Sequence, residues 1–343
     1  TSVAMGISTT ASAANSVAMG SSTTASGNQA VAIGSSSQAS GDNSMTMGSS
    51  TTASGNQAVA MGSGTTASGE NAFAVGNTAE AAGGQAFAHG SSYADGMDSV
   101  AMGSGTNASG AASVSMGQFS NASGESSAVF GDATIAEGDR AMAIGSGANA
   151  SGDNAFAGGV SSIASGENAF AVGNSCQATG ETSSCFGDSG IASGTGAFAT
   201  GFSTEAKGVN SAVFGWTSQA HGDQSFAAVA ANATGENSTA FGGRIEAGGT
   251  YSFAVALSDL SGTNVSQDNT FSVMGGNIGL NTTTPDTNVA VHINATLMLD
   301  PIDTPTDCNL TTRGIIYMDD SESMLCFCNG TNYYFMNDTA QTC

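Results

Sequence analysis

The 343-residue sequence has little positive charge. Four Lys+Arg stand against 27 Asp+Glu, giving a formal net charge of −23 at pH 7. A surface of this sign repels nucleic acid and anionic membranes, and nucleic-acid binding is excluded. Long apolar runs are also lacking, and none approaches the ~20 residues of a membrane-spanning helix. We expect no membrane insertion by this segment, and its start in mid-repeat predicts a processed product or a fragment.

Motifs of catalysis are lacking as well. The three histidines, His89, His221 and His292, lie far apart, and neither His-X-X-X-His nor Cys-X-X-Cys occurs. The Gly-X-Gly occurrences belong to a repeat and precede no helix that could bind phosphate. We therefore expect a protein that is not an enzyme and needs no cofactor.

Glycine, in contrast, is abundant and regularly spaced, with 49 Gly against 3 Pro. The stretch Asn-Ser-Val-Ala-Met-Gly-Ser-Ser-Thr-Thr-Ala-Ser-Gly-Asn at 15–28 recurs every fourteen residues to about Ala256. Nearly every repeat has a corner glycine such as Gly20, replaced by Val229 and Ala256 in two coils, and a second glycine seven residues later, such as Gly27. About five residues separate these glycines, which suits a short strand and excludes a helix. The pattern predicts an all-β solenoid of about nineteen coils, with glycines supplying permissive backbone at two corners.

Two coils are one residue shorter than the rest. The missing residue falls after Gly90 in one coil and after Val229 in the other, at the same corner. A stack that accepts length changes at one corner only is typical of paired strands joined by one tolerant turn.

Within each coil, bulky and small residues alternate. Val17 and Met19 flank Ala18, and Ala25 follows on the second strand, so the alternation places them on opposite faces. A flattened fourteen-residue coil has little room inside, which predicts alanine ladders in the interior and Val, Met and Phe outside. Such a continuous apolar stripe favours burial against copies of the chain in a closed cyclic homo-oligomer.

Threonines recur after the corner glycine in the first coils. We expect them to form outward ladders, which are ordinary on a polar strand edge and would otherwise suit ice binding. They are Thr9, Thr10, Thr23, Thr24, Thr51, Thr52, Thr65 and Thr66.

Ion binding has two weak candidates. Acidic residues follow the second glycine in many coils, among them Asp42, Glu70, Asp153 and Glu167. Stacked carboxylates repel unless water screens them or Ca²⁺ lies between them, and the absence of the calcium-roll nonapeptide favours water. His89 replaces a bulky apolar residue, so copies of it could hold an ion at an oligomer axis. A hydrogen-bonded histidine without a ligand is the favoured interpretation.

Six cysteines predict disulfides and an oxidising compartment. Cys176 and Cys185 occupy small interior positions on successive strands, so we expect them to pair, the alternative being two buried thiols. Four more lie in the last 36 residues. Of their three possible pairings we prefer Cys308–Cys328 with Cys326–Cys343, on the expectation that Cys326 and Cys328 point to opposite faces of a strand.

The period ends at Leu257, which predicts a roll at 1–257, a connector at 258–305 and a disulfide-stapled β-module at 306–343. In the connector, strands are expected at 289–293 and 296–299 and a linker at 301–305. In the module they are expected near 314–318, 324–328 and 333–336.

Candidate glycosylation sequons occur at Asn107, Asn121, Asn149, Asn264, Asn294, Asn309 and Asn329.

Ser-Val-Ala-Met-Gly at 2–6 and 16–20 and Thr-Thr-Ala-Ser-Gly at 23–27 and 51–55 resemble the head repeat of the YadA-like trimeric autotransporter adhesins. The resemblance covers about residues 1–256 and implies left-handed parallel β-rolls joined in threes, a homotrimer at the cell surface. Residues 276–286 resemble a segment of tail-fibre and other surface-fibre proteins.

The expected function is that of a non-enzymatic extracellular homotrimeric fibre or adhesin that mediates surface attachment through a rigid roll. The alternative is a virion or phage tail fibre with a receptor-binding C-terminal tip, located on the virion surface. Whether the receptor is a protein or a glycan stays open.

Overall fold

The computed structural model describes residues 1–280, 291–293, 301–302, 316–319, 325–328, 331–335 and 338–342. It separates into two units, residues 1–275 and 276–343. All regular elements in these ranges are strands, so the described residues contain no helix that could cross a membrane.

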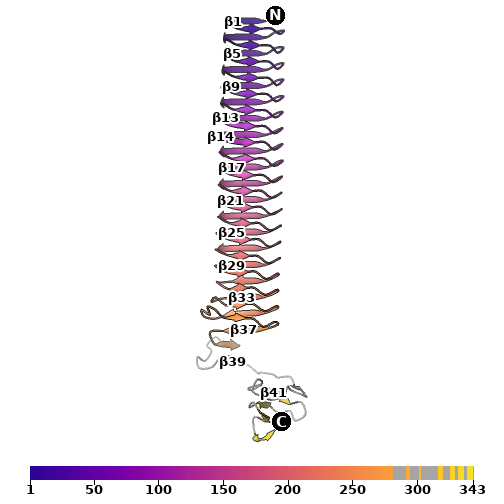
Figure 1. The fold of residues 1–343 in the computed structure, drawn as a ribbon, viewed down its shortest axis with the longest axis vertical. Helices are drawn as coiled ribbons and strands as arrows, with labels where there is room; N and C mark the ends of the chain where they lie inside the picture. The colour runs from indigo at the N-terminus through magenta and orange to yellow at the C-terminus, as the bar shows by residue number, and fades with distance from the viewer. Residues whose placement is uncertain are drawn as a thin grey trace. The chain divides into compact units, whose positions relative to one another are not determined.

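The first unit is one stack of coils that form a 37-stranded parallel sheet (Figure 1). Most coils contribute a long and a short strand, such as β3 (Val17–Ser21) and β4 (Thr24–Ala25). Each pairs with its counterpart one coil later, and Val17 lies opposite Val31, fourteen residues on. The predicted parallel solenoid of about nineteen coils is confirmed.

The remaining long strands are β1 (Val3–Ile7), β5 (Val31–Ser35), β7 (Met45–Ser49), β9 (Val59–Ser63), β11 (Phe73–Asn77), β13 (Phe87–Ala94), β14 (Val100–Ala108), β15 (Val114–Gln118), β17 (Ala128–Asp132), β19 (Met142–Ser146), β21 (Phe156–Val160), β23 (Phe170–Asn174), β25 (Ser184–Asp188), β27 (Phe198–Phe202), β29 (Ala212–Trp216), β31 (Phe226–Ala228), β33 (Thr239–Phe241), β35 (Phe253–Ala256) and β37 (Phe271–Met274). The short strands are β2 (Thr10–Ala11), β6 (Gln38–Ala39), β8 (Thr52–Ala53), β10 (Thr66–Ala67), β12 (Glu80–Ala81), β16 (Asn121–Ala122), β18 (Ile135–Ala136), β20 (Asn149–Ala150), β22 (Ile163–Ala164), β24 (Gln177–Ala178), β26 (Ile191–Ala192), β28 (Glu205–Ala206), β30 (Gln219–Ala220), β32 (Asn232–Ala233), β34 (Glu246–Ala247) and β36 (Asn264–Val265).

The interior of the roll consists of small side chains. Ala18, Ala25 and Ala32 are completely buried, as the alternation predicts. The expectation that all the threonines point outward is wrong for Thr23, Thr51 and Thr65, which are completely buried. Because the alanine two residues after each of them points inward, strand alternation turns these threonines inward too. The threonine between the buried threonine and the alanine, such as Thr24 between Thr23 and Ala25, lies on the outer surface of its strand.

The two glycines of a coil are needed for different reasons. Gly20 has a φ of +128°, and a Cβ there would also lie 1.9 Å from the carbonyl oxygen of Gly34. Gly27 has an ordinary φ, so the expectation that permissive backbone explains it is wrong. A Cβ on Gly27 would lie 2.0 Å from the oxygen of Gly41, so the close approach of the next coil excludes a side chain.

The two shortened coils deviate at the predicted corner. Between β13 and β14 the pairing changes from thirteen residues apart at Ser91 to fourteen at Tyr93. In the second case Val229 and Ala230 both adopt positive φ, at 63° and 61°. For a β-branched residue such as Val229 this conformation is unusual and strained.

The roll extends beyond the expected boundary at Leu257. After a loop, β36 and β37 add one more coil, and Asn264 pairs with Glu246, eighteen residues earlier instead of fourteen. The first unit therefore ends at Gly275. The extra coil was hidden in the sequence because four residues are inserted in its loop.

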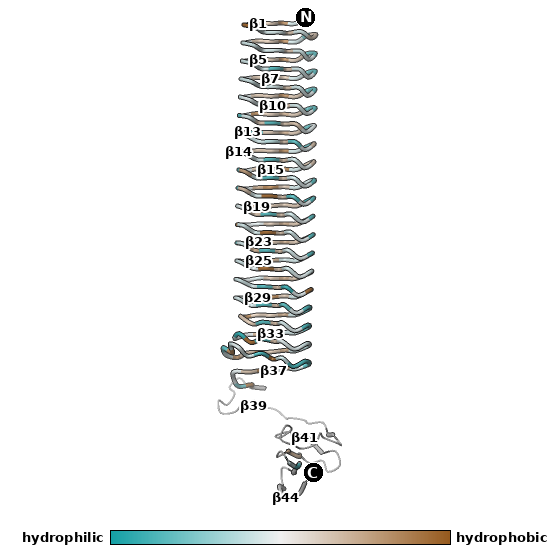
Figure 2. The backbone as a smooth tube through the Cα atoms, viewed as in Figure 1, coloured by the Kyte–Doolittle hydropathy of each residue, from teal (hydrophilic) through white to brown (hydrophobic). Residues whose placement is uncertain are grey.

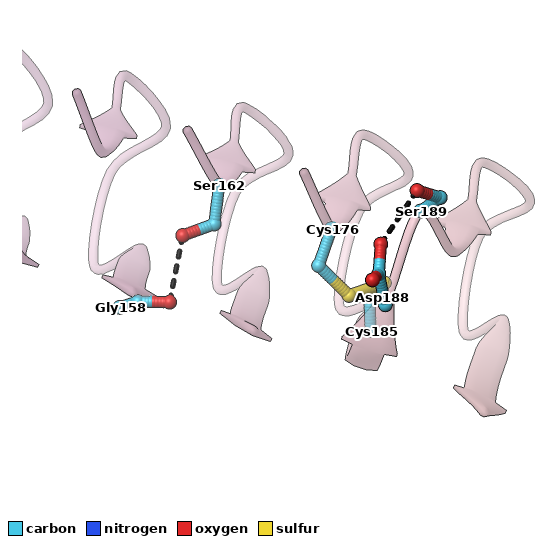
Figure 3. The surroundings of a disulfide bond; sticks show 6 residues. All are labelled: Gly158, Ser162, Cys176, Cys185, Asp188 and Ser189. Carbon is cyan, nitrogen blue, oxygen red and sulfur yellow. Dashed lines mark hydrogen bonds between the residues drawn. A yellow bond between two sulfur atoms is a disulfide. The ribbon is translucent and has the colours of Figure 1, made fainter. Parts of the chain in front are cut away.

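A disulfide joins Cys176 to Cys185 across the interior of the roll (Figure 3). Both residues are completely buried, and their Cα atoms are 5.9 Å apart. Cys176 follows the corner of one coil and Cys185 lies in β25 of the next, so the bond links adjacent coils. Gly190 occupies the inward position above this bond, where a Cβ would lie 3.0 Å from the Sγ of Cys185.

In the second unit, β38 (Ile278–Leu280) pairs in parallel with β39 (Val291–Ile293). Strands β40 (Pro301–Ile302), β41 (Ile316–Asp319), β42 (Leu325–Cys328), β43 (Tyr333–Phe335) and β44 (Asp338–Thr342) form a five-stranded sheet. The linker expected at 301–305 is thus partly a strand, and the expected strands at 289–293, 314–318, 324–328 and 333–336 correspond to β39, β41, β42 and β43. The strand expected at 296–299 lies outside the described residues.

Cys326 and Cys328 are both buried and disulfide-bonded, with half-buried Phe327 between them. The expectation that they point to opposite faces is wrong, because residues two apart in a strand share a face. Cys308 and Cys343 lie outside the described residues, so the preferred pairing stays a prediction.

The glycine ladder can be tested at two adjacent residues. A Cβ on Gly83 would lie 1.9 Å from the oxygen of Gly96, whereas a Cβ on Gly84 would meet nothing closer than 4.0 Å. We expect Gly83→Ala to lower the free energy of unfolding by about 2 kcal/mol or more, and Gly84→Ala to leave it unchanged or slightly raised. Denaturant unfolding followed by circular dichroism measures both. Equal effects of the two variants would contradict a ladder set by close approach.

The disulfide can be tested through Gly190. Replacing both Cys176 and Cys185 by Ala should lower stability by about 2–3 kcal/mol, since a short covalent loop is lost. Gly190→Ala should be destabilising in the native protein and less so in the double-alanine background, where the sulfur atoms are gone and the Thr204 Oγ1 atom, at 3.3 Å, is the remaining close neighbour of the added Cβ. A double-mutant cycle from thermal unfolding gives the coupling. A coupling of zero would show that Gly190 is not required by the disulfide.

Candidate functional site

The outward side chains of the long strands form two apolar ladders, which we call the apolar face. One ladder runs through Val17, Val31 and Phe73, and the other through Met19 and its equivalents, all in continuous parallel register. In Figure 2, apolar segments recur within the strands, while hydrophilic residues are frequent at the corners. The prediction that Val, Met and Phe lie outside the coil is confirmed.

Contacts between adjacent coils cover these side chains only in part. Met19 remains 37% exposed, Met47 38% and Phe214 39%. A strip of this kind along the whole first unit exceeds the apolar patches that isolated soluble proteins carry. The apolar face is therefore the surface of the described chain best suited to bind another protein surface.

Phenylalanines take over the apolar face in its C-terminal half. Their rings contact one another in an unbroken series with centroid separations of 4.8–6.1 Å. From Phe170 to Phe253 the phenylalanine changes ladder from one coil to the next, and each ring still reaches the ring of the following coil. The sequence contains this phenylalanine series, but the interpretation of bulky and small residues did not single it out. The series is Phe156, Phe170, Phe186, Phe198, Phe214, Phe226, Phe241, Phe253 and Phe271.

His89 lies on the apolar face, as its place in the repeat predicts. It is in register between Val75 and Met102 and is exposed. An imidazole in this ladder is the one basic side chain that the described apolar face carries. Whether copies of His89 hold an ion stays a prediction.

The acidic residues after the second glycine have a structural role. The Asp42 Oδ1 atom accepts a hydrogen bond from the backbone N–H of Asn28 at 2.8 Å, one coil earlier. Asp139 and Asp153 do the same for Glu125 and Asp139, each at 3.0 Å. These carboxylates therefore satisfy corner N–H groups. Sequence reasoning missed this role, although asparagine alternates with aspartate at the same position, as expected of an acceptor.

The described part of the chain contains no group of three or more His, Cys, Asp or Glu side chains that could hold a metal ion. Glu70 and Glu167 are exposed at their corners. The Ca²⁺ hypothesis for Asp42, Glu70, Asp153 and Glu167 stays untested.

The outer surface of the short strands, which we call the polar face, carries mostly Thr, Gln, Asn and Glu. Ile135, Ile163, Ile191 and Tyr93 are the apolar or aromatic residues at this position. Glu205 here contacts Lys207 and, at 2.9 Å, the Nε2 atom of His221. Partial burial raises the pKa of Glu205, but the hydrogen bonds from Lys207 and His221 outweigh it and hold that pKa below its usual value. A lowered pKa stabilises the fold above the carboxyl's unfolded pKa, and this contribution is lost as pH falls through the folded pKa.

The candidate glycosylation sites differ in accessibility. Asn107, Asn121 and Asn149 are half-buried in the polar face, and each has a buried Oδ1 atom. Asn264, in β36, is exposed. Asn294, Asn309 and Asn329 lie outside the described residues. Attachment of glycans stays a prediction.

Comparison with known proteins agrees with this geometry. Most of the first unit matches the family described as YadA head domain repeat (2 copies), and no curated protein matches the chain. The matched segments are residues 1–23, 25–51, 39–65, 53–79, 67–92, 90–106, 94–120, 108–134, 136–162, 150–175, 164–185, 206–228 and 229–244. Heads of this family are structural parts of trimeric surface adhesins, not enzymes. The resemblance of residues 276–286 to tail-fibre segments is not confirmed. With its parallel fourteen-residue coils and their outward apolar ladders, the chain belongs to the YadA head domain family.

Proposed function

We propose that the chain is the stiff head of an extracellular homotrimeric fibre that attaches one surface to another. The observation that carries this proposal is the apolar face, which runs the length of the first unit and is left partly exposed by the residues that the structure describes. Parallel chains packed around a three-fold axis would cover it on all three copies at once.

Burial of the apolar face supplies the energy for assembly. At about 25 cal/mol per Å², covering the exposed third of a Met or Phe side chain contributes about 1 kcal/mol. With two such positions in most coils, the sum exceeds the cost of association many times. Identical coils would lie at the same height in all three copies, so like side chains, including His89, would meet.

The buried disulfide supports the extracellular location. A bond between Cys176 and Cys185 in the middle of the roll suits an oxidising compartment. Attachment then requires no chemistry, because a rigid trimer presents three equal surfaces and gains avidity from weak contacts. Retention of beads coated with the protein on cell or matrix layers under flow tests attachment.

The trimer is tested by mass in solution. The native protein should have about three times its chain mass of 33.3 kDa. Met47→Asp with Met61→Asp, which places carboxylates on the apolar face, should shift the protein toward the monomer. Thr52→Asp with Thr66→Asp places them on the polar face of the same coils and should leave the trimer intact. Light scattering after size-exclusion chromatography measures all three proteins. A monomeric native protein would refute the assembly.

A further inference from the structure

The coils depart from regularity on one side near the end of the roll. There the corner after Val229 lacks a residue, and the loop at 257–263 has four extra. The tube in Figure 2 bulges outward between β33 and β37. Together the recessed corner, which includes Ala230, and the projecting loop border an open hollow of about 360 Å³. This volume suits a small ligand such as one or two sugar rings.

Polar side chains line this hollow. Four of them are on the roll, namely Thr217, Asn232, Arg244 and Glu246, and two are on the loop, Ser261 and Thr263. They offer amide, guanidinium, carboxylate and hydroxyl groups, so both donors and acceptors converge on one space.

Internal contacts hold these groups in place. Thr234 donates a hydrogen bond to Glu246 at 2.8 Å, and Arg244 pairs with Asp259 of the loop at 3.3 Å. The backbone N–H of Leu260 donates to the oxygen of Gly243 at 2.6 Å, which ties the loop to the roll. The hollow is therefore formed before any ligand binds.

An aromatic surface adjoins the hollow. Trp216 directly precedes Thr217, which also lines the hollow, and 66% of Trp216 is exposed. Its ring packs against Phe202 of the previous coil with centroids 5.2 Å apart. In the first coils this corner position is Ser, as at Ser21 and Ser35, so an exposed aromatic pair here is not required by the repeat.

We propose that Trp216 and the hollow beside it bind a neutral saccharide. A sugar ring has an apolar face of C–H groups, which stacks on an indole, and hydroxyls, which need both donors and acceptors. Acidic sugars are disfavoured, because Glu246 and Asp259 outnumber Arg244 and the whole chain carries −23.

This inference deepens the proposed function, since the saccharide would be part of the surface to which the fibre attaches. The residues that line the hollow belong to the corner after β29, to the short strands β32 and β34 with their flanking residues, and to the loop, and none of them is a ladder residue of the apolar face. A trimer would thus display three such sites and strengthen weak binding through multivalency.

Trp216 is the only tryptophan of the chain, so its fluorescence reports on this site directly. The native protein is applied to an array of galactose-, mannose- and N-acetylglucosamine-terminated oligosaccharides and their sialylated forms. The best neutral compound is then titrated while emission is recorded. We expect binding of at least one neutral compound, with a shift of the emission maximum to shorter wavelength. No bound neutral compound, or sialylated compounds only, would overturn the inference.

Variants locate the binding. By surface plasmon resonance with the same compound, Trp216→Ala and Glu246→Gln should each weaken affinity at least tenfold. Phe119→Ala, which removes another exposed corner aromatic, should leave affinity unchanged. Retained trimer mass and circular dichroism exclude misfolding. Full affinity in Trp216→Ala would overturn the inference, whereas a trimer that attaches to surfaces without binding saccharide would leave the proposed function intact.

Discussion

The structure depends on the close parallel stacking of one coil on the next. At the second glycine of nearly every coil the approach is so close that a methyl group would overlap the carbonyl of the following coil, as between Gly27 and Gly41. This stacking recurs every fourteen residues in most coils and aligns the outward side chains into ladders. The small interior follows from the same constraint, because a coil of this length encloses little more than methyl and hydroxyl groups.

The alignment has opposite effects on the two surfaces of the roll. On the polar face, stacking brings amides and hydroxyls into ladders that water solvates. On the apolar face, it aligns Val, Met and Phe side chains into a strip that the described part of the chain leaves partly exposed. The same repetition also supplies hydrogen-bond partners at the corners. Carboxylates such as those of Asp42 and Asp139 accept a hydrogen bond from a backbone N–H group in the preceding coil. The stacking of equal coils thus stabilises the roll and also creates the apolar strip that favours association with other chains.

Much of the roll was predictable from the sequence, because the period of the repeat gives the length of a coil and the alternation of residue types gives the direction of each side chain. The coil period, the inward alanines, the outward bulky residues and the Cys176–Cys185 bond all followed from spacing. What failed depended on three-dimensional detail. The inward direction of Thr23 and the steric reason for Gly27 require the path of the corner and the position of the next coil. The extra coil after Leu257 escaped because its insertion broke the period, and the hollow beside Trp216 arises from two irregularities 30 or so residues apart.

The direction of the backbone hydrogen bonds has a mechanical consequence. In a stack of parallel coils these bonds run along the rod, in series with any pull on its ends, so tension opens them one coil at a time instead of shearing many together. Each released coil of fourteen residues adds up to about 50 Å of extended chain, and the Cys176–Cys185 bond withholds the short segment it encloses. Under tension such a roll would unfold one coil at a time and lengthen in small, nearly equal steps. It would dissipate mechanical energy while both of its ends stay attached.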